Sequence, residues 1–365
     1  MPNDLLYQIA LTLVPNIGDV RAKALIETFG EAESIFKAPK KQLEAIDGIG
    51  AIAANSIKHF SDFTLCEEEI KFIEKNKIAP LFITDENYPQ RLLNCYDSPT
   101  LLYYKGNADL NTTKIISIVG TRNNSDYGKI ICEKLLEDVA EQNVLVMSGL
   151  AFGIDSIAHK ASLKNKLKTV GVVAHGLDKI YPAQNKLLAK EMLSQGGLLT
   201  DFMSGTNPDR QNFPRRNRIV AGICDALIVI ESSKKGGSLI TAELANSYNK
   251  DVFAIPGRVN DVRSEGCNYL IKNNKSLLIT CADDLLHMMN WKDEPKKVKK
   301  QRELFIELTP DEKIITDILA QQETIQIDQL YFKSGLSSSA VANALLMLEM
   351  QGVVTMMPGK VFKLA

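Results

Sequence analysis

The sequence predicts an α/β protein, in which a doubly wound, mostly parallel sheet forms the centre of the chain. An N-terminal helical module and a C-terminal winged-helix module are predicted on either side of it. Two observations predict the sheet. Short apolar runs alternate with helical stretches from Ile115 onwards, and most runs are continuous, as in strands that are buried on both faces. Glycine-rich turns follow these runs, which is typical of right-handed βαβ units.

The clearest such unit spans residues 144–162. The apolar run Val144–Met147 predicts a buried strand, Ser148 and Gly149 break the run, and Gly153 precedes a helix that begins near Asp155. Backbone N–H groups at a turn of this kind, together with the positive end of the helix dipole, form a site for an anion. Any tight turn between a strand and a helix also favours glycine, so this loop alone leaves both interpretations open.

The other predicted elements continue the alternation. The predicted strands are residues 115–119, 144–147, 169–174, 198–200, 226–230, 252–255 and 277–279. The predicted helices between them include residues 127–141, 183–195, 238–248 and 268–273. Ligands of such sheets bind beyond the carboxyl ends of the strands, near the switch in strand order. The residues directly after each strand are therefore the candidate binding residues of this Rossmann-like domain.

Composition narrows the class of protein. The chain has 365 residues, of which 45% are hydrophobic and 24% charged, as in globular proteins of two or three domains. No apolar run approaches the roughly 20 residues of a membrane helix, and no basic leader opens the chain. The six cysteines are scattered without a Cys-x-x-Cys pair, which favours reduced thiols in a cytosol. We expect no membrane insertion, no metal site and no cofactor.

Charge is unevenly distributed along the chain. The net charge is only −1, which by itself makes no case for a nucleic-acid partner. Four arginines nevertheless fall within nine residues, at positions 210, 215, 216 and 218. A cluster of this kind indicates an anion site, although a solvated helix face is the alternative.

Residues 1–66 are predicted to form a helical module, similar to SAM or helix-hairpin-helix domains. Two similar pieces, residues 13–18 and 46–50, each contain glycine and lead into a helix. Such a hairpin lets backbone amides approach a phosphate, but it is equally common as plain helix packing. Residues 1–62 carry six Lys or Arg against eight Asp or Glu, and this acidic balance favours packing.

Residues 67–290 are assigned to the sheet domain. It opens with a helix over residues 65–76 and a strand over residues 80–84, followed by a loop-rich segment up to residue 113. Residues 291–304 are polar and contain proline, which predicts a linker.

Residues 305–365 are predicted to form a winged helix. The pattern indicates helices at residues 311–321, 327–330 and 337–350, and hairpin strands at 352–355 and 361–364. The helix that would enter a DNA groove carries no Lys or Arg, and residues 304–365 have a net charge of −3. We therefore interpret this module as a protein-contact or regulatory unit.

Glycine turns after several predicted strands come together with the cations Arg122, Arg210 and Lys235 at one edge of the predicted sheet. Phosphates need N–H donors and cations, and arginine adds a rigid bidentate fork. Phe213 could stack on a base or could be an ordinary core residue. The chain contains no G-x-x-x-x-G-K-[ST] and no G-x-G-x-x-G after a strand, so a P-loop NTPase is excluded.

Seven motifs in order resemble those of the bacterial DNA-processing protein A family (DprA, also called Smf). They are IVGTR at 118–122, SGLAFGIDSIAH at 148–159, GLDKIYPAQN at 176–185, FPRRNRIVAG at 213–222, GGSLITAELA at 236–245, IPGRVND at 255–261 and SEGCNYLI at 264–271. The resemblance covers the whole alternating domain, and the flanking modules fit the family's three-part layout. One departure is Val173-Ala174-His175, where the family commonly shows a Leu-Gly-containing turn.

The resemblance implies a cytoplasmic, homodimeric protein of natural transformation that is not an enzyme. Members of the family bind and protect incoming single-stranded DNA and load the RecA recombinase onto it. Carried across, Arg122 would hold a phosphate, Arg210 would supply a second cation and Phe213 would stack on a base. The implied DNA-binding residues are Gly120, Thr121, Arg122, Ser148, Gly149, Gly153, Arg210, Phe213, Arg215, Arg216, Asn217, Arg218, Lys235, Gly236, Gly237, Ser238 and Thr241.

Two other functions are considered. The first is a nucleotide-processing enzyme of Rossmann type, such as a nucleoside monophosphate N-glycosidase, or a nucleotide-sensing binder. This chemistry needs a carboxylate beside the glycosidic bond, for which Glu243, Asp155 or Glu231 could serve, but no two carboxylates stand out as a pair. The second is a purely structural hub, which is disfavoured because a hub needs no row of phosphate-type loops.

Overall fold

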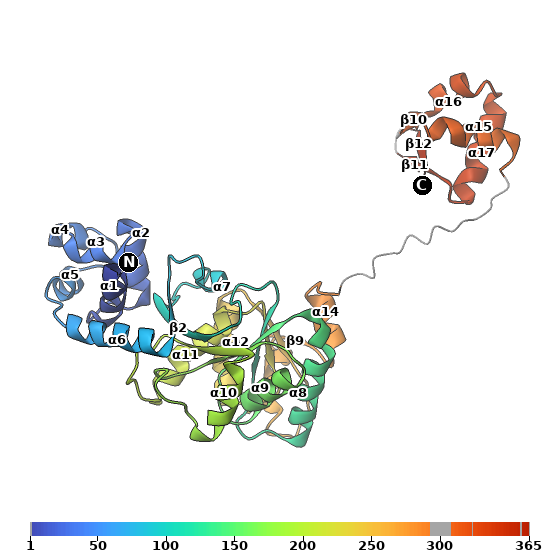
Figure 1. Cartoon of the computed structure of the whole chain (residues 1–365). Coiled ribbons are helices and arrows are strands. Elements are labelled where there is room, and N and C mark those ends of the chain that lie inside the picture. Colours follow the sequence, from blue (N-terminus) through green and yellow to red (C-terminus); the bar gives the residue numbers. More distant parts are fainter. Residues whose placement is uncertain (1, 293–307, 323, 358–359, 365) are drawn as a thin grey trace. The chain divides into compact units, whose positions relative to one another are not determined.

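The computed structural model describes residues 2–292, 308–322, 324–357 and 360–364 (Figure 1). The chain divides into two compact units, Met1–Asp293 and Glu294–Ala365. The predicted linker, residues 291–304, lies outside the described residues from position 293 onwards. The finer boundaries at residues 66 and 305 stay predictions, and the two units are described separately.

A nine-stranded sheet forms the centre of the first unit, with the strand order β1-β2-β6-β5-β4-β3-β7-β8-β9. All neighbours from β6 to β9 are parallel, whereas β1 and β2 form an antiparallel edge. The mostly parallel sheet predicted from the apolar runs is therefore confirmed. The strands are β1 Ala79–Phe82, β2 Leu101–Gly106, β3 Ile115–Val119, β4 Leu145–Ser148, β5 Thr169–Val172, β6 Gly196–Thr200, β7 Ala226–Val229, β8 Asp251–Ala254 and β9 Leu277–Leu278.

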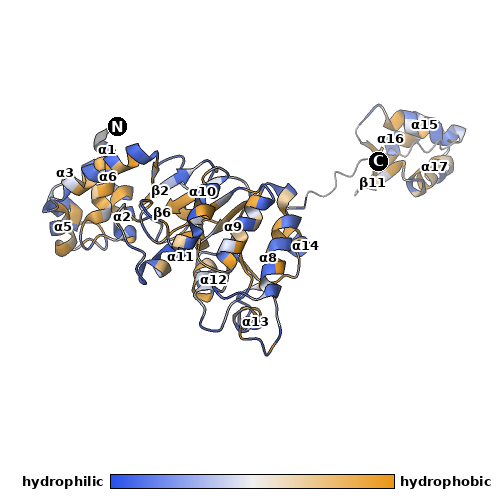
Figure 2. Ribbon diagram, turned by 60° about the horizontal axis from the view of Figure 1, so that its bottom comes forward, coloured by the Kyte–Doolittle hydropathy of each residue, from blue (hydrophilic) through white to orange (hydrophobic). Residues whose placement is uncertain are grey.

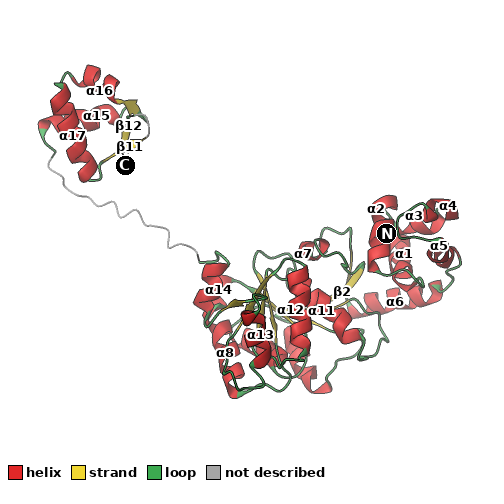
Figure 3. Cartoon of the chain, turned by 180° about the vertical axis from the view of Figure 1, so that it is seen from behind, coloured by secondary structure: helices red, strands yellow, loops and turns green. Residues whose placement is uncertain are grey.

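Helices cover both faces of this sheet because successive strand residues point to opposite sides. Ile116 and Val146 pack with α8 (Asp126–Asp138), α9 (Ile154–Lys164) and α14 (Ala282–Met288), which lie before the sheet in Figure 1. Ile115 and Leu145 face the layer of α11 (Asn212–Gly222), α12 (Gly237–Ser247) and α13 (Glu265–Lys272), seen from the reverse side in Figure 3. The doubly wound arrangement is confirmed. Figure 2 shows hydrophilic and hydrophobic residues along these helices, as expected of a layer with one wet side.

Between β5 and β6 the chain forms α10 (Lys186–Met192), which packs against α9 and both strands. Short 3-10 turns precede β4 (Ala140–Gln142) and α10 (Ala183–Asn185).

Two elements of the first unit differ from the sequence-based expectation. The segment expected to be loop-rich contains a short helix α7 (Gln90–Leu93) and the strand β2, which pairs antiparallel with β1 and β6.

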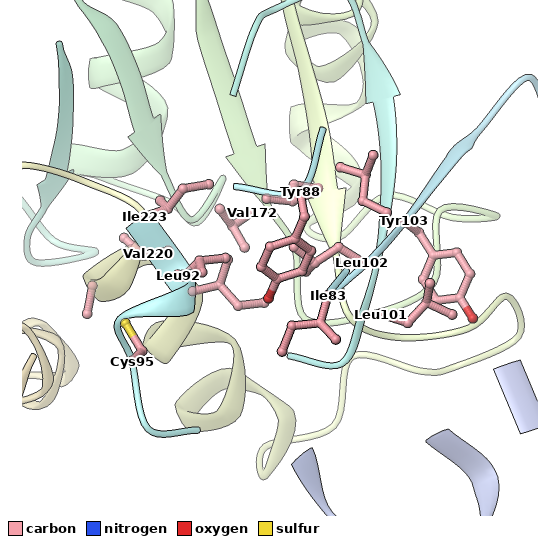
Figure 4. Packing of buried hydrophobic residues seen from close by; sticks show 14 of the residues in the cluster. Ile83, Tyr88, Leu92, Cys95, Leu101, Leu102, Tyr103, Val172, Val220 and Ile223 are labelled. Carbon is pink, nitrogen blue, oxygen red and sulfur yellow. The ribbon is translucent and has the colours of Figure 1, made fainter. Parts of the chain in front are cut away.

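The loop around α7 is tied to the sheet by a buried tyrosine. The Tyr88 hydroxyl donates to the Pro99 carbonyl at 2.6 Å, and its ring belongs to the same core as Leu92 and Leu102. Figure 4 shows these residues together with Val172 of β5 and Val220 of α11. The edge strands and the helix that carries the arginine cluster therefore share one core.

The N-terminal helical module is observed. Its helices are α1 Pro2–Leu13, α2 Asp19–Phe29, α3 Ala32–Lys37, α4 Lys40–Glu44, α5 Ala51–Lys58 and α6 Phe63–Asn76. The two glycine hairpins lead into α2 and α5, with Gly18 and Gly50 as N-caps. Four aromatic rings (Tyr7, Phe36, Phe60, Phe63) pack with centroid distances of 5.2–5.9 Å.

The second unit contains a winged helix, as predicted. Its elements are α15 Pro310–Leu319, β10 Ile325–Gln326, α16 Ile327–Ser334, α17 Ser338–Met350, β11 Val354–Met357 and β12 Val361–Leu364, with the sheet order β10-β12-β11. A capping box between Thr309 and Glu312 begins α15. The outer face of α17 exposes Leu346, Met347 and Met350.

Within the described residues, no helix is both long and apolar enough to cross a membrane. The same residues contain no group of three or more His, Cys, Asp or Glu side chains that could hold a metal ion. All six cysteines are free, and only Cys281 is not buried.

Candidate nucleic-acid interface

A cavity of about 570 Å³ opens at the carboxyl edge of the sheet. It is bounded by the turns after β3 and β4, by the start of α12 and by α11. The strand order runs in opposite directions from β3 and from β7, so the helices that follow them, α8 and α12, cover opposite faces of the sheet. The cavity lies at this switch point. The structure therefore places a ligand-sized hollow where the sequence pattern predicted one.

Twelve of the seventeen predicted site residues line this cavity. They are Gly120, Thr121, Arg122, Gly149, Arg210, Phe213, Arg216, Asn217, Gly236, Gly237, Ser238 and Thr241. The lining residues that sequence reasoning did not select as binding residues are Val119, Ala151, Asp155, Tyr181, Pro208, Pro214, Val220 and Ile240. All of these except Pro208 fall inside the recognised motifs, so the signal was present, but the apolar members such as Val220 and Ile240 also fit the apolar pattern of a helix core.

An aromatic and cationic wall forms one side of the cavity. The Arg122 guanidinium lies over the Phe213 ring, 5.4 Å from its centroid. Tyr181 contacts the same ring at a centroid distance of 6.0 Å and is itself exposed. Phe213 is only half-buried, so it is a wall residue with an accessible ring rather than a core residue.

A buried cation forms the floor. The Arg216 side chain is 4% exposed, and one of its terminal N–H groups donates to the Val172 carbonyl. Its Nε has no hydrogen-bond partner among the described residues. Burial lowers the pKa of Arg216, and the neighbouring Asp155 carboxylate offsets part of this shift, so the guanidinium stays charged. A buried cation with an unused donor is stabilised by an anion that enters the cavity.

Gly149 is required at this floor. A Cβ at this position would lie 2.6 Å from Asp155 Oδ2 and closer still to the Arg216 guanidinium. Burial raises the pKa of Asp155, and the positive charge of Arg216 partly opposes this rise. The two side chains are therefore opposite charges that lie near each other in a buried site, not an ion pair in solvent. The glycine therefore leaves the space between strand and cation open.

Backbone donors come from the start of α12. Gly236 is the N-cap and no side chain caps the helix, so the first N–H groups stay free for a ligand. A Cβ on Gly237 would meet nothing within 4 Å, which shows how open this side of the cavity is. Ser238 turns inward and donates to the Ser232 hydroxyl at 2.8 Å, so its backbone, not its hydroxyl, is available.

Five predicted site residues do not line the cavity. The Ser148 hydroxyl is buried and donates to the Ile118 carbonyl at 2.7 Å. Gly153 begins α9, where a Cβ would collide with the Thr121 and Arg122 carbonyls. Lys235 is exposed beside the rim. The remaining two residues, Arg215 and Arg218, lie on the other side of α11.

Arg218 links α11 to the N-terminal module instead of facing the cavity. Its side chain is 10% exposed and forms ion pairs with Asp201 at 2.6 Å and with Asp19 of α2 at 2.8 Å. Burial alone would lower the pKa of Arg218, but the two carboxylates outweigh burial and raise it. The Arg215 guanidinium stacks over Phe202, 5.2 Å from the ring centroid, and lines a separate hollow at the same junction.

His175, at the position that departs from the family pattern, is a buried anchor. Its Nε2 accepts from the Tyr181 N–H at 3.2 Å, so Nδ1 carries the proton and donates to the Gly176 carbonyl at 2.9 Å. Burial lowers the pKa of His175, which keeps the ring neutral. The residue thus holds the loop that presents Tyr181 to the cavity.

The carboxylates do not form a catalytic pair. Asp155 is the only Asp or Glu among the described residues that line the cavity. Glu231 accepts from the Ser125 N–H at 2.9 Å and from its hydroxyl, and Glu243 pairs with Lys275 at 3.1 Å on the surface. This arrangement disfavours a two-carboxylate glycosidase, which needs both groups beside one bond.

Comparisons with known proteins agree with this geometry. Three family models match the chain: DNA recombination-mediator protein A over residues 79–290, the DprA winged helix domain over residues 302–360, and a helix-hairpin-helix motif over residues 8–65. Protein Smf of Synechocystis is 31% identical over 97% of both chains. DNA processing protein DprA of Streptococcus pneumoniae is 41% identical over 58% of this chain and 75% of its own length.

Two solved structures are also similar. The X-ray structure of DNA processing protein A from Streptococcus pneumoniae has a TM-score of 0.67 at 33% identity, and covers 77% of this chain and 97% of that chain. A structure of DNA processing protein A from Helicobacter pylori, described by its single-stranded DNA binding mode, has a TM-score of 0.54 at 29% identity and covers 59% and 96%. On the evidence of the fold, the motifs and these matches, the chain belongs to the DNA recombination-mediator protein A family.

Proposed function

We propose that this protein binds single-stranded DNA in the cavity and, without catalysing a reaction, loads RecA recombinase onto the bound strand. The observation that carries the proposal is the composition of the wall and floor. Arg122, Arg210 and Arg216 offer three cations against the single carboxylate of Asp155, beside an accessible Phe213 ring. Cations for phosphates and a ring for a base are what a binder of single strands needs.

A single strand fits this arrangement better than a duplex. The ring of Phe213 lies inside a cavity of about 570 Å³, so a base reaches it only when it is splayed out of a stack. The donors around it are guanidinium groups and backbone N–H groups at the start of α12, which bind phosphate oxygens of any sequence. We therefore expect binding that depends little on base identity.

The finer parts of the proposal are supported by relatives. The Helicobacter pylori relative is described as binding single-stranded DNA, and curated relatives are named as DNA processing proteins. The role in natural transformation, the transfer to RecA, the homodimer and the cytoplasmic location follow from the family resemblance and stay predictions. The presence of only one carboxylate in the cavity supports a binding protein rather than a glycosidase.

The decisive experiment is fluorescence anisotropy with a labelled oligo-dT strand and a matched duplex across a range of salt concentrations. We expect tight binding of the single strand, with log affinity falling by about 0.7 per decade of salt for each phosphate neutralised. The variant Arg122→Glu/Arg210→Glu should lose binding. The control variant Lys134→Glu/Lys160→Glu changes the same charge in another hollow, on α8 and α9, and should bind as the unmodified chain does.

Equal loss in both variants, or no binding of the unmodified chain at low salt, would contradict the proposal. Transfer is tested next by following RecA filament growth on the strand with and without this protein. The Arg122→Glu/Arg210→Glu variant should give no acceleration. Acceleration that survives in this variant would separate RecA loading from the cavity.

A further inference from the structure

We propose that the DNA strand leaves the cavity across the loops that follow β7 and β8, where Lys234, Lys235, Arg258 and Arg263 bind its phosphates. This inference rests on the proposed function, because it extends the path of the same strand. None of these residues except Lys235 belongs to the predicted site, and none lines the cavity. We call this surface the exit shelf.

The exit shelf is continuous with the cavity wall. In the sheet, β7 lies between β3 and β8, so the loops after these three strands are neighbours. Backbone bonds join them: Thr121 N–H donates to the Glu231 carbonyl at 2.8 Å, and Ser232 N–H donates to the Arg263 carbonyl at 2.8 Å. The Arg263 Nε also donates to the Asn123 carbonyl at 2.9 Å, next to Arg122. A strand held at Arg122 therefore has the shelf directly beside it.

The cations of the exit shelf are available for a ligand. All four side chains belong to exposed residues, and none forms an ion pair within 4.0 Å in the described part of the chain. The nearest acidic residues in sequence are Glu231, Asp261 and Glu265. Glu231 accepts from the Ser125 N–H and hydroxyl, and Asp261 accepts from the Arg263 N–H and the Ser264 hydroxyl of its own turn. Free cations at the rim attract phosphates, whereas paired ones contribute little.

The opposite side of the cavity is less suited to a polyanion. There the loop after β6 carries the exposed Asp209 directly beside the cation of Arg210, and Lys179 is already paired with Asp178 at 3.3 Å. The Lys179 ammonium also donates to Asn207 Oδ1 at 2.9 Å. Two routes out of the cavity thus differ in charge, and the shelf is the positive one.

The loop after β8 is ordered yet displays apolar side chains. Asp261 N–H donates to the Arg258 carbonyl at 3.1 Å, and the Asn268 amide exchanges two hydrogen bonds with the Gly257 backbone at 3.0 and 3.3 Å. On this loop Val259 is 86% exposed and Val262 is 63% exposed. Apolar groups beside cations suit a strand whose bases are unstacked, and an ordered loop loses little entropy when it binds.

The test compares two lengths of labelled oligo-dT, about 4 and about 16 nucleotides, because bound lengths per module fall in this range. The short strand occupies the cavity only, whereas the long one reaches the exit shelf. The variant Lys234→Glu/Arg258→Glu should bind the long strand about tenfold more weakly, with a salt slope smaller by about 1.4 for two lost phosphates, and should bind the short strand normally. Arg263 is left intact because its side chain holds the loop.

The outcomes separate the two proposals. If the unmodified chain binds neither strand, the proposed function itself fails. If it binds both and the variant binds both equally well, the strand leaves by another route and the shelf is wrong. An equal loss for short and long strands would also overturn the shelf, because it would show a general effect of charge. The Lys134→Glu/Lys160→Glu variant, with the same change in net charge, should leave both affinities and both salt slopes unchanged.

Discussion

Two arginines on α11 show how differently one helix can use the same side chain. Arg216 points to the cavity, where it donates to a strand carbonyl and keeps its Nε free. Arg218 points to the N-terminal module, where Asp19 and Asp201 bind it at 2.8 and 2.6 Å. The cavity side thus holds a cation with no carboxylate within 4.0 Å, and the junction side holds one that two carboxylates bind, although the Arg218 Nε also lacks a partner among the described residues.

This difference shows how to distinguish the arginines of a basic cluster that bind a ligand from those that stabilise the fold. A buried cation that carboxylates bind directly stabilises the fold, whereas a cation with no carboxylate within 4.0 Å is free to bind an anion from a ligand. By this criterion, Arg216 belongs to the interface together with Arg122, and Arg218 belongs to the junction between module and sheet. The first two predictions below test the two sides of this division, and the other two concern the Arg122 loop and the winged helix.

The largest expected effect is on stability. Arg218→Ala leaves Asp19 and Asp201 without their cation, and breaking a buried ion pair costs about 3 kcal/mol or more of the free energy of unfolding. Urea denaturation measures this loss, while the folded variant should bind oligo-dT with nearly unchanged affinity. Arg215→Ala is the matched control, because its exposed guanidinium only stacks on Phe202 and should cost about 0.5–1 kcal/mol. A variant of Arg218 that folds normally but fails to bind DNA would reverse the assignment.

The second expected effect is on the cavity floor. Gly149→Ala forces a methyl group against Arg216 and Asp155, so we expect a loss of DNA affinity of about 100-fold and a destabilisation of about 1–3 kcal/mol. Gly50→Ala, at the N-cap of α5 and outside the cavity, is the control, because its new methyl group would meet nothing within 4 Å. Fluorescence anisotropy with labelled oligo-dT measures the DNA affinity of both variants. Similar affinities would show that the floor takes no part in binding.

A smaller effect is expected from Glu231, which holds the loop that carries Arg122. Its carboxylate accepts from both Ser125 groups, and its carbonyl accepts from Thr121 N–H. Glu231→Gln removes one acceptor and should weaken DNA binding about tenfold by loosening this loop. The same change made in an Arg122→Ala background should have almost no further effect, as a double-mutant cycle would show. Additive losses would mean that Glu231 acts independently of Arg122.

The smallest effect is expected from the winged helix. Its helix α17 exposes Leu346, Met347 and Met350 and carries no Lys or Arg, unlike α11. A chain that ends at residue 293 should therefore bind oligo-dT within about twofold of the full chain, because phosphate contacts dominate such affinities. A loss of tenfold or more in anisotropy would assign DNA contacts to the winged helix.

Much of the fold could be predicted from the sequence because the central strands are continuous apolar runs. Strand β3, Ile115–Val119, is buried throughout and was predicted with its observed ends. Strand β2 was missed, because Leu101–Gly106 is surrounded by prolines and glycines and its pairing with β6 is a long-range choice. The first residues of β6 were missed for a related reason. Gly196 and Gly197 look like a turn, yet a side chain at either would collide with a neighbouring strand.

The site was predicted in outline, since motifs and strand ends identify the loops that meet at one edge. The direction in which each side chain points could not be predicted. Three arginines lie close together in the sequence, at positions 215, 216 and 218. Because side chains point in different directions around a helix, only Arg216 lines the cavity. Arg218 pairs with Asp19, which lies about 200 residues away in the sequence, so no local sequence pattern predicts this ion pair.

The Asp19–Arg218 ion pair also has a consequence for hydrogen exchange. Helix α11 presents Phe213 and Asn217 to the cavity and is fastened through Arg218 to the first turn of α2, so the two helices should open as one cooperative unit. Amide hydrogens of α2, which touch no DNA in the proposed complex, should then exchange more slowly when a strand occupies the cavity. Protection would spread into the N-terminal module through a single guanidinium group.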